Sequence, residues 1–195
     1  VLSATRDAVL TAPVPIFLAF VRATRELLLP LKAAQLGATS SRVGTIMAVS
    51  FAVDTALVPV AGFAMDRLGR KYAAVPALAI SSIGMAAVSF CSSTSQLLAA
   101  GVVLGLGNGM SNGWIQTVGA DLAPPGARAQ FLGVWNLGMG VGTTAGPLVI
   151  GAIAQWQDVA VASFAAALVS AAGALWYTLL GVETLAERER GSNLL

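Results

Sequence analysis

The sequence has no histidine and a single cysteine, Cys91, among its 195 residues. These absences exclude a disulfide within the chain, a Cys/His zinc site and histidine as a general base. Charge is also scarce, because 10% of the residues are charged whereas soluble domains carry about 25%. So few charges cannot cover the surface of a soluble protein, and we expect the chain to lie in a lipid bilayer.

Several function classes have no support in the sequence. The net charge is +2, and the eleven basic residues form no patch interleaved with aromatic residues, so we expect no nucleic-acid partner. No nucleophile–base pair or cluster of metal ligands appears, and we therefore expect neither an enzyme nor a cofactor. The GLGNG stretch at 105–109 looks like a nucleotide loop. It follows no strand and lies inside an apolar segment, so we reject that interpretation.

Long apolar runs are what the sequence does contain, with 56% hydrophobic residues. A membrane-spanning helix needs roughly 20 mainly apolar residues, and open strands cannot satisfy their backbone in lipid. Residues 8–20 could also serve as a signal-peptide core, but apolar character resumes beyond Arg25, which favours a true span. The sequence predicts an all-α membrane protein, one bundle of six transmembrane helices at approximately 12–36, 43–64, 72–92, 96–119, 129–154 and 158–181.

The basic residues predict how this bundle is oriented. Arg42, with Lys32 near the edge, lies on one side, and a larger basic set lies on the other: Arg6, Arg67, Arg70, Lys71, Arg128, Arg188 and Arg190. Positively charged loops remain in the cytoplasm. We therefore expect both termini inside and Cys91 near the external face, where a membrane-impermeant thiol reagent should reach it in intact cells if the thiol is accessible.

A charged stretch, GFAMDRLGRK at 62–71, separates the second and third predicted spans. It matches GxxxDRxGR[RK] at every defining position, and so resembles the signature loop of the major facilitator superfamily. The resemblance implies a cytoplasmic gate contact that holds one conformational state. A plainer interpretation is anchoring by three basic residues, which leaves the Asp and the glycines unexplained. The residues of this expected gating loop are Gly62, Asp66, Arg67, Gly69, Arg70 and Lys71.

The resemblance extends along nearly the whole chain. GADLAPPGARAQFLGVW at 119–135 resembles the family's Asp…Pro…Arg loop, and Glu183-Thr184 resembles the ET that often ends a half. The fifth predicted span resembles the glycine-proline helix of family exporters at Gly138, Gly140, Gly142, Gly146, Pro147 and Gly151. Family transporters have twelve spans in two halves. The resemblance therefore implies that this chain is one six-span half, and we expect it to be the C-terminal half. The whole transporter would be similar to bacterial drug or metabolite exporters and would lie in the inner (plasma) membrane. The first residue is Val, so we also expect the start to be missing or processed.

Charged residues within the predicted spans are candidates for a substrate or proton pathway, because buried charge in a membrane is costly. Arg25 lies 14 residues before the first loop's centre and Asp54 lies 15 after it. At about 1.5 Å per residue, both reach similar depth on adjacent helices and can pair. Arg22 and Glu26 are four residues apart and can also pair. Substrate or proton binding and a purely structural ion pair are equally open here.

The fourth predicted span carries a second set of candidates. Asn108, Asn112 and Gln116 recur every four residues and would form one polar stripe, which lines a substrate path or bonds to another helix. In the fifth span, Gly138, Gly142 and Gly146 suit close helix packing, and Pro147 predicts a bend.

These features predict secondary transport of a small molecule by alternating access, as proton-coupled export of drugs or metabolites. No ATP-binding loop is present, which points to an ion gradient. One bundle cannot form the transport cavity alone, so we expect the other six-span half, a partner chain or a homodimer. The alternative is a non-transporting, truncated or regulatory membrane protein that binds a partner through its glycine-rich helices.

Overall fold

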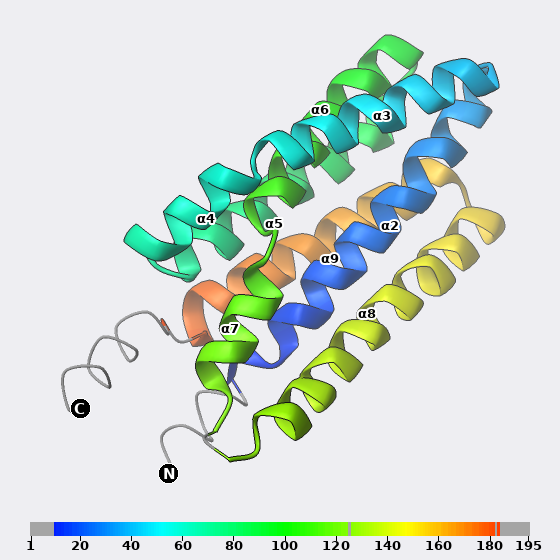
Figure 1. The fold of residues 1–195 in the computed structure, drawn as a ribbon. Coiled ribbons are helices and arrows are strands. Elements are labelled where there is room, and N and C mark those ends of the chain that lie inside the picture. The colour runs from blue at the N-terminus through cyan, green and yellow to red at the C-terminus, as the bar shows by residue number, and fades with distance from the viewer. Residues whose placement is uncertain (1–9, 125, 182, 184–195) are drawn as a thin grey trace.

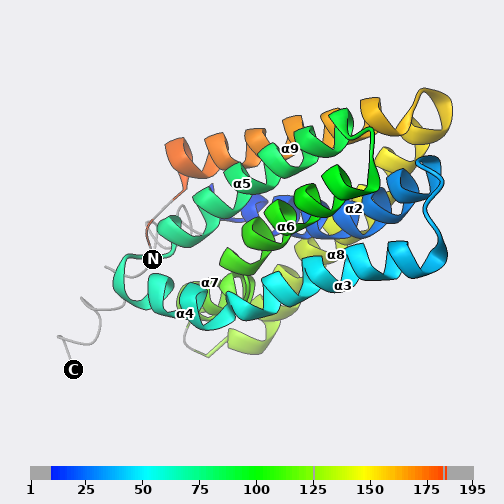
Figure 2. The ribbon, with the colours of Figure 1, turned by 90° about the horizontal axis from the view of Figure 1, so that it is seen from above.

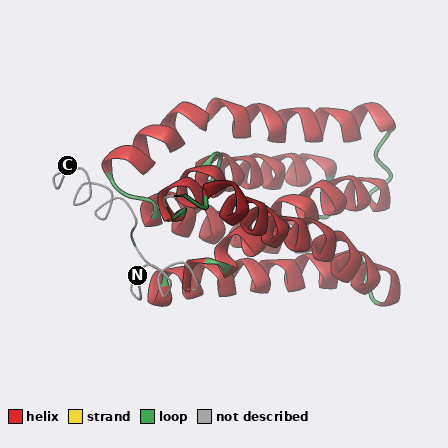
Figure 3. Ribbon diagram, turned by 60° about the horizontal axis from the view of Figure 1, so that its bottom comes forward, coloured by secondary structure: helices red, strands yellow, loops and turns green. Residues whose placement is uncertain are grey.

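The computed structural model describes residues 10–124, 126–181 and 183. Within these ranges the regular structure is entirely helical, with no strand (Figure 3). The helices are α2 Pro13–Gln35, α3 Ser40–Ala56, α4 Val58–Arg67, α5 Lys71–Phe90, α6 Thr94–Met110, α7 Trp114–Leu122, α8 Arg128–Trp156 and α9 Val159–Leu180.

The helices lie side by side as a bundle (Figure 1). Helix α2 packs against α8 and α9, α5 packs against α9 and α6, and α6 packs against α3. Figure 2 shows α5 and α9 along one side and α3 on the opposite side, with α2 and α6 between them. The α4–α5 and α7–α8 connections lie at one end of the bundle, and the α2–α3, α5–α6 and α8–α9 connections lie at the other.

The second predicted span, 43–64, is divided into α3 and α4 at Leu57. Pro59 lies in the first turn of α4, and proline has no N–H to donate to the carbonyl four residues earlier. The N–H of Leu57 is shared between the carbonyls of Val53 and Asp54, at 3.3 and 3.2 Å. The predicted span did not anticipate this break, because the absent backbone hydrogen bond depends on one proline, Pro59, inside an apolar run.

The fourth predicted span, 96–119, is divided more sharply, into α6 and α7. Gly113 has a φ of +80°, a left-handed conformation that cannot continue a helix. Just before it, the N–H groups of Ser111 and Asn112 donate to carbonyls three residues earlier, which tightens the end of α6. The expected Asn108–Asn112–Gln116 stripe is therefore not carried by one helix: Asn108 lies on α6, Asn112 in the turn and Gln116 on α7.

Glycines on α8 allow its backbone to approach that of α2. A Cβ atom added to Gly142 would overlap the carbonyl oxygen of Ile16, and one on Gly146 would lie 2.9 Å from that of Phe20. Gly138 contacts α2 more loosely, with an added Cβ 3.7 Å from Ile16. Pro147 lies inside α8, which remains one helix through it. On α6, Gly105 and Gly109 approach the backbone of α3 in the same way.

Among the described residues, four helical segments are long and apolar enough to cross a membrane: Ser40–Arg67, Lys71–Phe90, Arg128–Trp156 and Val159–Leu180. The first of these comprises α3 and α4 together. Helix α2 carries four charged residues, and α6 has 17 residues before its break. Large apolar side chains face outward on these segments, among them Phe63, Phe90, Val134, Leu137, Leu148 and Leu179. The described chain is an all-α protein whose outer surface suits lipid.

Candidate functional site in two buried polar clusters

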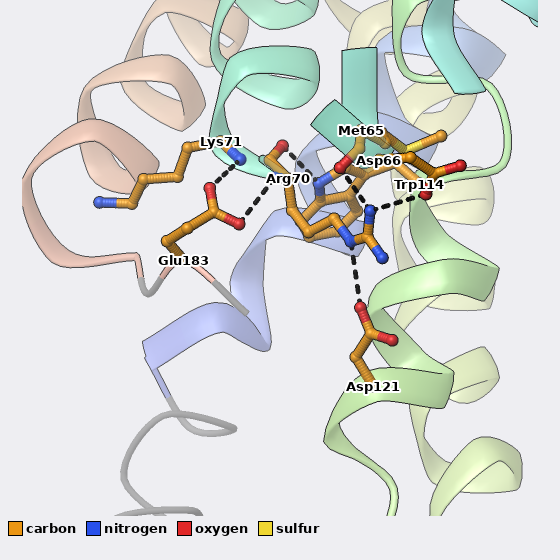
Figure 4. Close-up of polar contacts among 7 residues, drawn as sticks. All are labelled: Met65, Asp66, Arg70, Lys71, Trp114, Asp121 and Glu183. Carbon is orange, nitrogen blue, oxygen red and sulfur yellow. Dashed lines mark hydrogen bonds and ion pairs between the residues drawn. The ribbon is translucent and has the colours of Figure 1, made fainter. Parts of the chain in front are cut away.

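Polar side chains gather in two places within the bundle. The loop cluster lies at the α4–α5 end and comprises Met65, Asp66, Arg70, Lys71, Trp114, Asp121 and Glu183 (Figure 4). The midspan cluster lies between α2, α3 and α6 and comprises Arg22, Arg25, Asp54, Asn108 and Asn112.

Arg70 is the centre of the loop cluster and is fully buried. Its Nε donates to the Asp121 carboxylate at 3.0 Å, and its Nη1 donates to the Asp66 carboxylate at 3.2 Å. The same Nη1 donates to the carbonyl of Met65. Asp66 itself is 73% exposed, so its ion pair with Arg70 is screened by solvent. Arg70 therefore ties the end of α4 to α7 mainly through the buried contacts.

Glu183, beyond the end of α9, caps the neighbouring helix α5. Its carboxylate accepts from the backbone N–H of Arg70 at 2.7 Å and from that of Lys71 at 2.9 Å. A carboxylate is favoured there because the first N–H groups of a helix lack intrahelical partners and carry partial positive charge. Gly69 makes the approach possible: its φ is +112°, and an added Cβ would lie 2.5 Å from Glu183 Oε2.

Two aromatic residues close the loop cluster on its inner side. Trp114, at the start of α7, is fully buried and donates its indole N–H to the carbonyl of Arg70 at 3.0 Å. It packs edge-to-face on Tyr177 with ring centroids 5.4 Å apart. Lys71 Nζ lies 5.8 Å from the centre of the Tyr177 ring and donates to the carbonyl of Thr178.

Two members of the expected gating loop lie outside this network. Arg67 is exposed, and its guanidinium lies 5.1 Å from the centre of the Phe63 ring. A Cβ added to Gly62 would meet nothing within 4 Å among the described residues, so no close helix contact depends on this glycine. The basic residues Arg6, Arg188 and Arg190, and Thr184 of the ET pair, lie outside the described residues.

Asp54 is the acceptor at the centre of the midspan cluster. Its Oδ2 accepts from Arg25 Nη2 at 3.2 Å and also from the side-chain amide of Asn108, while its Oδ1 accepts from Asn112 at 3.4 Å. The pairing of Arg25 with Asp54, anticipated from their depth, is therefore present. The guanidinium of Arg25 also lies over the Phe51 ring, 4.8 Å from its centre.

Arg22 bonds differently from the expectation. Its Nε donates to Asn108 Oδ1 at 3.2 Å, and no ion pair joins it to Glu26 within the described part of the chain. Glu26 is exposed on α2. Gln116 is exposed on α7 and lies outside the cluster because the helix break turns it away from the direction set by Asn108.

The midspan cluster retains unused hydrogen-bonding capacity. Arg25 is 2% exposed and Asp54 is 6% exposed, so both charges are withdrawn from solvent. Two nitrogens of Arg25, Nε and Nη1, are buried without a partner in the described structure. Unpartnered buried donors are costly and uncommon in folded proteins. These two donors are therefore available to a further acceptor.

Sequence reasoning did not foresee four members of the loop cluster: Met65, which contributes its carbonyl, and Trp114, Asp121 and Glu183. Asp121 and Glu183 both lie in stretches that resemble family motifs, which was a usable signal. Their convergence on Arg70 was not readable, because 51 and 113 residues separate the partners. For Trp114, its place beside the glycine-rich break was the remaining signal.

Relatives with known names share this fold and part of this sequence. The chain is 30% identical over 122 residues to the MFS-type efflux transporter ffsH of Aspergillus flavipes, covering 60% of this chain and 22% of that protein. It is 34% identical over 85 residues to the bacillibactin exporter of Bacillus subtilis, covering 41% and 21%. The solved structure of the peptide transporter POT in complex with sulfate superposes with a TM-score of 0.78 at 16% identity, covering 97% and 43%.

The chain thus spans about a fifth of the length of these curated relatives and under half of the solved transporter. A model of the family described as the Major Facilitator Superfamily matches residues 12–193. That match includes both polar clusters and the GFAMDRLGRK loop. The chain belongs to the major facilitator superfamily, a family of membrane transporters and not of enzymes.

Proposed function

We propose that the chain forms one six-span half of a secondary transporter that moves a small molecule across a membrane by alternating access. The observation that carries this proposal is the buried Arg25–Asp54 pair with its two amide partners. Charge within a membrane is expensive and is retained chiefly along substrate or ion pathways. This pair lies between α2, α3 and α6, where a facing half would enclose it.

Alternating access requires a second bundle that rocks against the first about a midplane site. The other six-span half, a partner chain or a second copy of this chain supplies it. Helices α3, α4 and α8 support this arrangement because they expose broad apolar faces. The basic residues Arg67, Lys71 and Arg128 at the loop-cluster end support an orientation with that end, and both termini, in the cytoplasm of a bacterial inner membrane.

Proton coupling is assigned to Asp54. A protonated Asp54 loses its attraction for Arg25, whose charge must then find another acceptor or move toward water. Substrate or proton binding at this pair would thereby change which side of the bundle is open. The direction of transport in this proposal is export, by analogy with the efflux relatives.

The test is flux in proteoliposomes that contain the full-length chain, with an imposed proton gradient and a panel of anionic, neutral and cationic compounds. We expect gradient-dependent movement of at least one compound, abolished by a protonophore and by Asp54→Asn. Asp158→Asn is the matched control, since Asp158 is an exposed N-cap on the α8–α9 connection. Normal coupled flux in the Asp54→Asn protein would overturn the assignment to Asp54.

A second candidate function is partner binding without transport. It rests on α8, where Gly133 and Gly140 have open space at Cβ and Val134, Leu137 and Val141 are exposed beside them. Small residues in an apolar face allow close helix contact in membranes. Absence of flux for every compound, combined with a stable complex that Gly140→Leu disrupts, would favour this function over transport.

A further inference from the structure

We propose that the half-site beside the midspan cluster binds a small carboxylate with an apolar body, with Arg22 as the residue that holds the carboxylate. This rests on the proposed transport function and names its substrate class. A cavity of about 170 Å³ lies between α2, the α6–α7 break and α8. The residues that line it and carry the argument are Leu18, Arg22, Ser111, Ile115, Met139 and Thr143.

Arg22 is the charged group of this lining and has free donors. Its Nε is engaged by Asn108 at 3.2 Å, which fixes the guanidinium plane. Both Nη groups are without a hydrogen-bond partner in the described residues, and the side chain is exposed. A guanidinium held at one edge and open along the other matches the two oxygens of a carboxylate.

The remaining polar groups of the lining are already engaged as donors. Ser111 donates its hydroxyl to the carbonyl of Asn108 at 2.9 Å, and Thr143 donates to that of Met139 at 3.0 Å. Neither hydroxyl is therefore available to bind an anion without breaking its bond. The N-terminus of α7, at Trp114, adds partial positive charge at the same break. Arg22 should accordingly account for most of the preference for an anion.

Charge and volume limit the ligand further. Two carboxylates lie near Arg22: Asp54, which is paired with Arg25, and Glu26, which is exposed one turn away on α2. A dianion would be repelled by both. A monoanion meets the Arg22 charge with less repulsion. Leu18, Ile115 and Met139 provide an apolar wall. A cavity of roughly 150 Å³ holds a benzene ring, so an aromatic ring or a short branched chain fits this one.

The test uses the purified full-length chain in nanodiscs and measures equilibrium binding by calorimetry, without a proton gradient. The probes are benzoate and benzamide, which share a size and differ in charge. Since hydrogen bonds to charged groups contribute about 1.5–3 kcal/mol, we expect benzoate to bind about tenfold or more tightly than benzamide. Arg22→Gln should remove that preference and leave benzamide binding unchanged.

Two further variants control for folding and for general charge. Arg42→Gln removes an exposed arginine at the start of α3 and should leave both affinities unchanged. Met139→Phe keeps every charge but fills the cavity, so it should weaken both probes. Equal binding of the two probes, or benzoate affinity insensitive to both Arg22→Gln and Met139→Phe, would overturn the inference.

The experiments distinguish failure of the carboxylate-site proposal from failure of the transport proposal. Gradient-driven flux of neutral or cationic compounds, with no carboxylate preference in binding, would leave transport standing and reject the carboxylate site. Benzoate binding that depends on Arg22, with no flux of any compound, would support the site and reject transport.

Discussion

Arg70 and Arg25 are both buried arginines paired with aspartates, yet they use their guanidinium groups differently. Arg70 engages Nε and Nη1 with two carboxylates and a carbonyl, and one nitrogen, Nη2, is unpartnered. Arg25 engages Nη2 with Asp54, and two nitrogens are unpartnered. In the loop cluster most of the Arg70 donors have acceptors, whereas in the midspan cluster most of the Arg25 nitrogens have none among the described residues. The two clusters therefore differ in how many buried guanidinium donors have no partner among the described residues, one at Arg70 and two at Arg25.

Arg70→Ala should have the largest effect on stability. Removing one partner of a buried ion pair costs about 3–5 kcal/mol, and Arg70 also holds the carbonyl of Met65. The measurement is reversible unfolding in detergent micelles. Arg67→Ala is the matched control in the same loop and should cost about 1 kcal/mol or less, because Arg67 is exposed over Phe63. Similar losses of stability for the two variants would mean that the buried contacts of Arg70 contribute no more than the exposed side chain of Arg67.

Gly69→Ala should follow, with a loss of about 2–3 kcal/mol. The positive φ disfavours any side chain, and the new Cβ would displace the Glu183 carboxylate from two backbone N–H groups. Gly126→Ala separates these causes, since Gly126 has a φ of +89° and open space at Cβ. It should lose about 1–2 kcal/mol from backbone strain alone. Equal losses would mean that Glu183 contributes nothing measurable to the loop cluster.

Asn108→Ala should cost less, about 1–2 kcal/mol, because a single amide bridges Arg22 and Asp54. Asn112→Ala is the comparison within the same cluster, with a bond of 3.4 Å from a half-buried side chain, and should cost below about 0.5 kcal/mol. Unfolding in micelles again reports both values. A larger loss at Asn112 would show that the turn after α6, and not the amide bridge, organises the midspan cluster.

The smallest expected effect is the interaction energy between the loop cluster and the midspan cluster. The two clusters share no residue, so the losses of Arg70→Ala and Asn108→Ala should add within about 0.5 kcal/mol in the double variant. A larger interaction energy would mean that the α6–α7 break, which lies between Asn108 and Trp114, links the two clusters mechanically.

The sequence was informative where a property depends on composition or on a contiguous motif. Helical character, scarcity of charge and the DRLGRK loop were all readable, and the Arg25–Asp54 pair followed from the similar distances of the two residues from the loop between their helices. Contacts such as Arg70–Asp121 were not readable, because they depend on how helices distant in sequence pack. The breaks at Leu57 and Gly113 were missed because a proline or glycine in an apolar run fits either a bend or a continuous span. The displaced Gln116 was a consequence of the second break.

The cap that Glu183 places on α5 also bears on how the chain is assembled in the membrane. The backbone N–H of Arg70 and its acceptor are separated by 113 residues. At translation rates of about 5–20 residues per second, roughly 6–23 seconds pass between synthesis of the donor and of the acceptor. During that interval the start of α5 is without this partner. The start of α5 is therefore synthesised before the residue that caps it, and Glu183, beyond α9, completes the end of the bundle at which α4 and α5 meet.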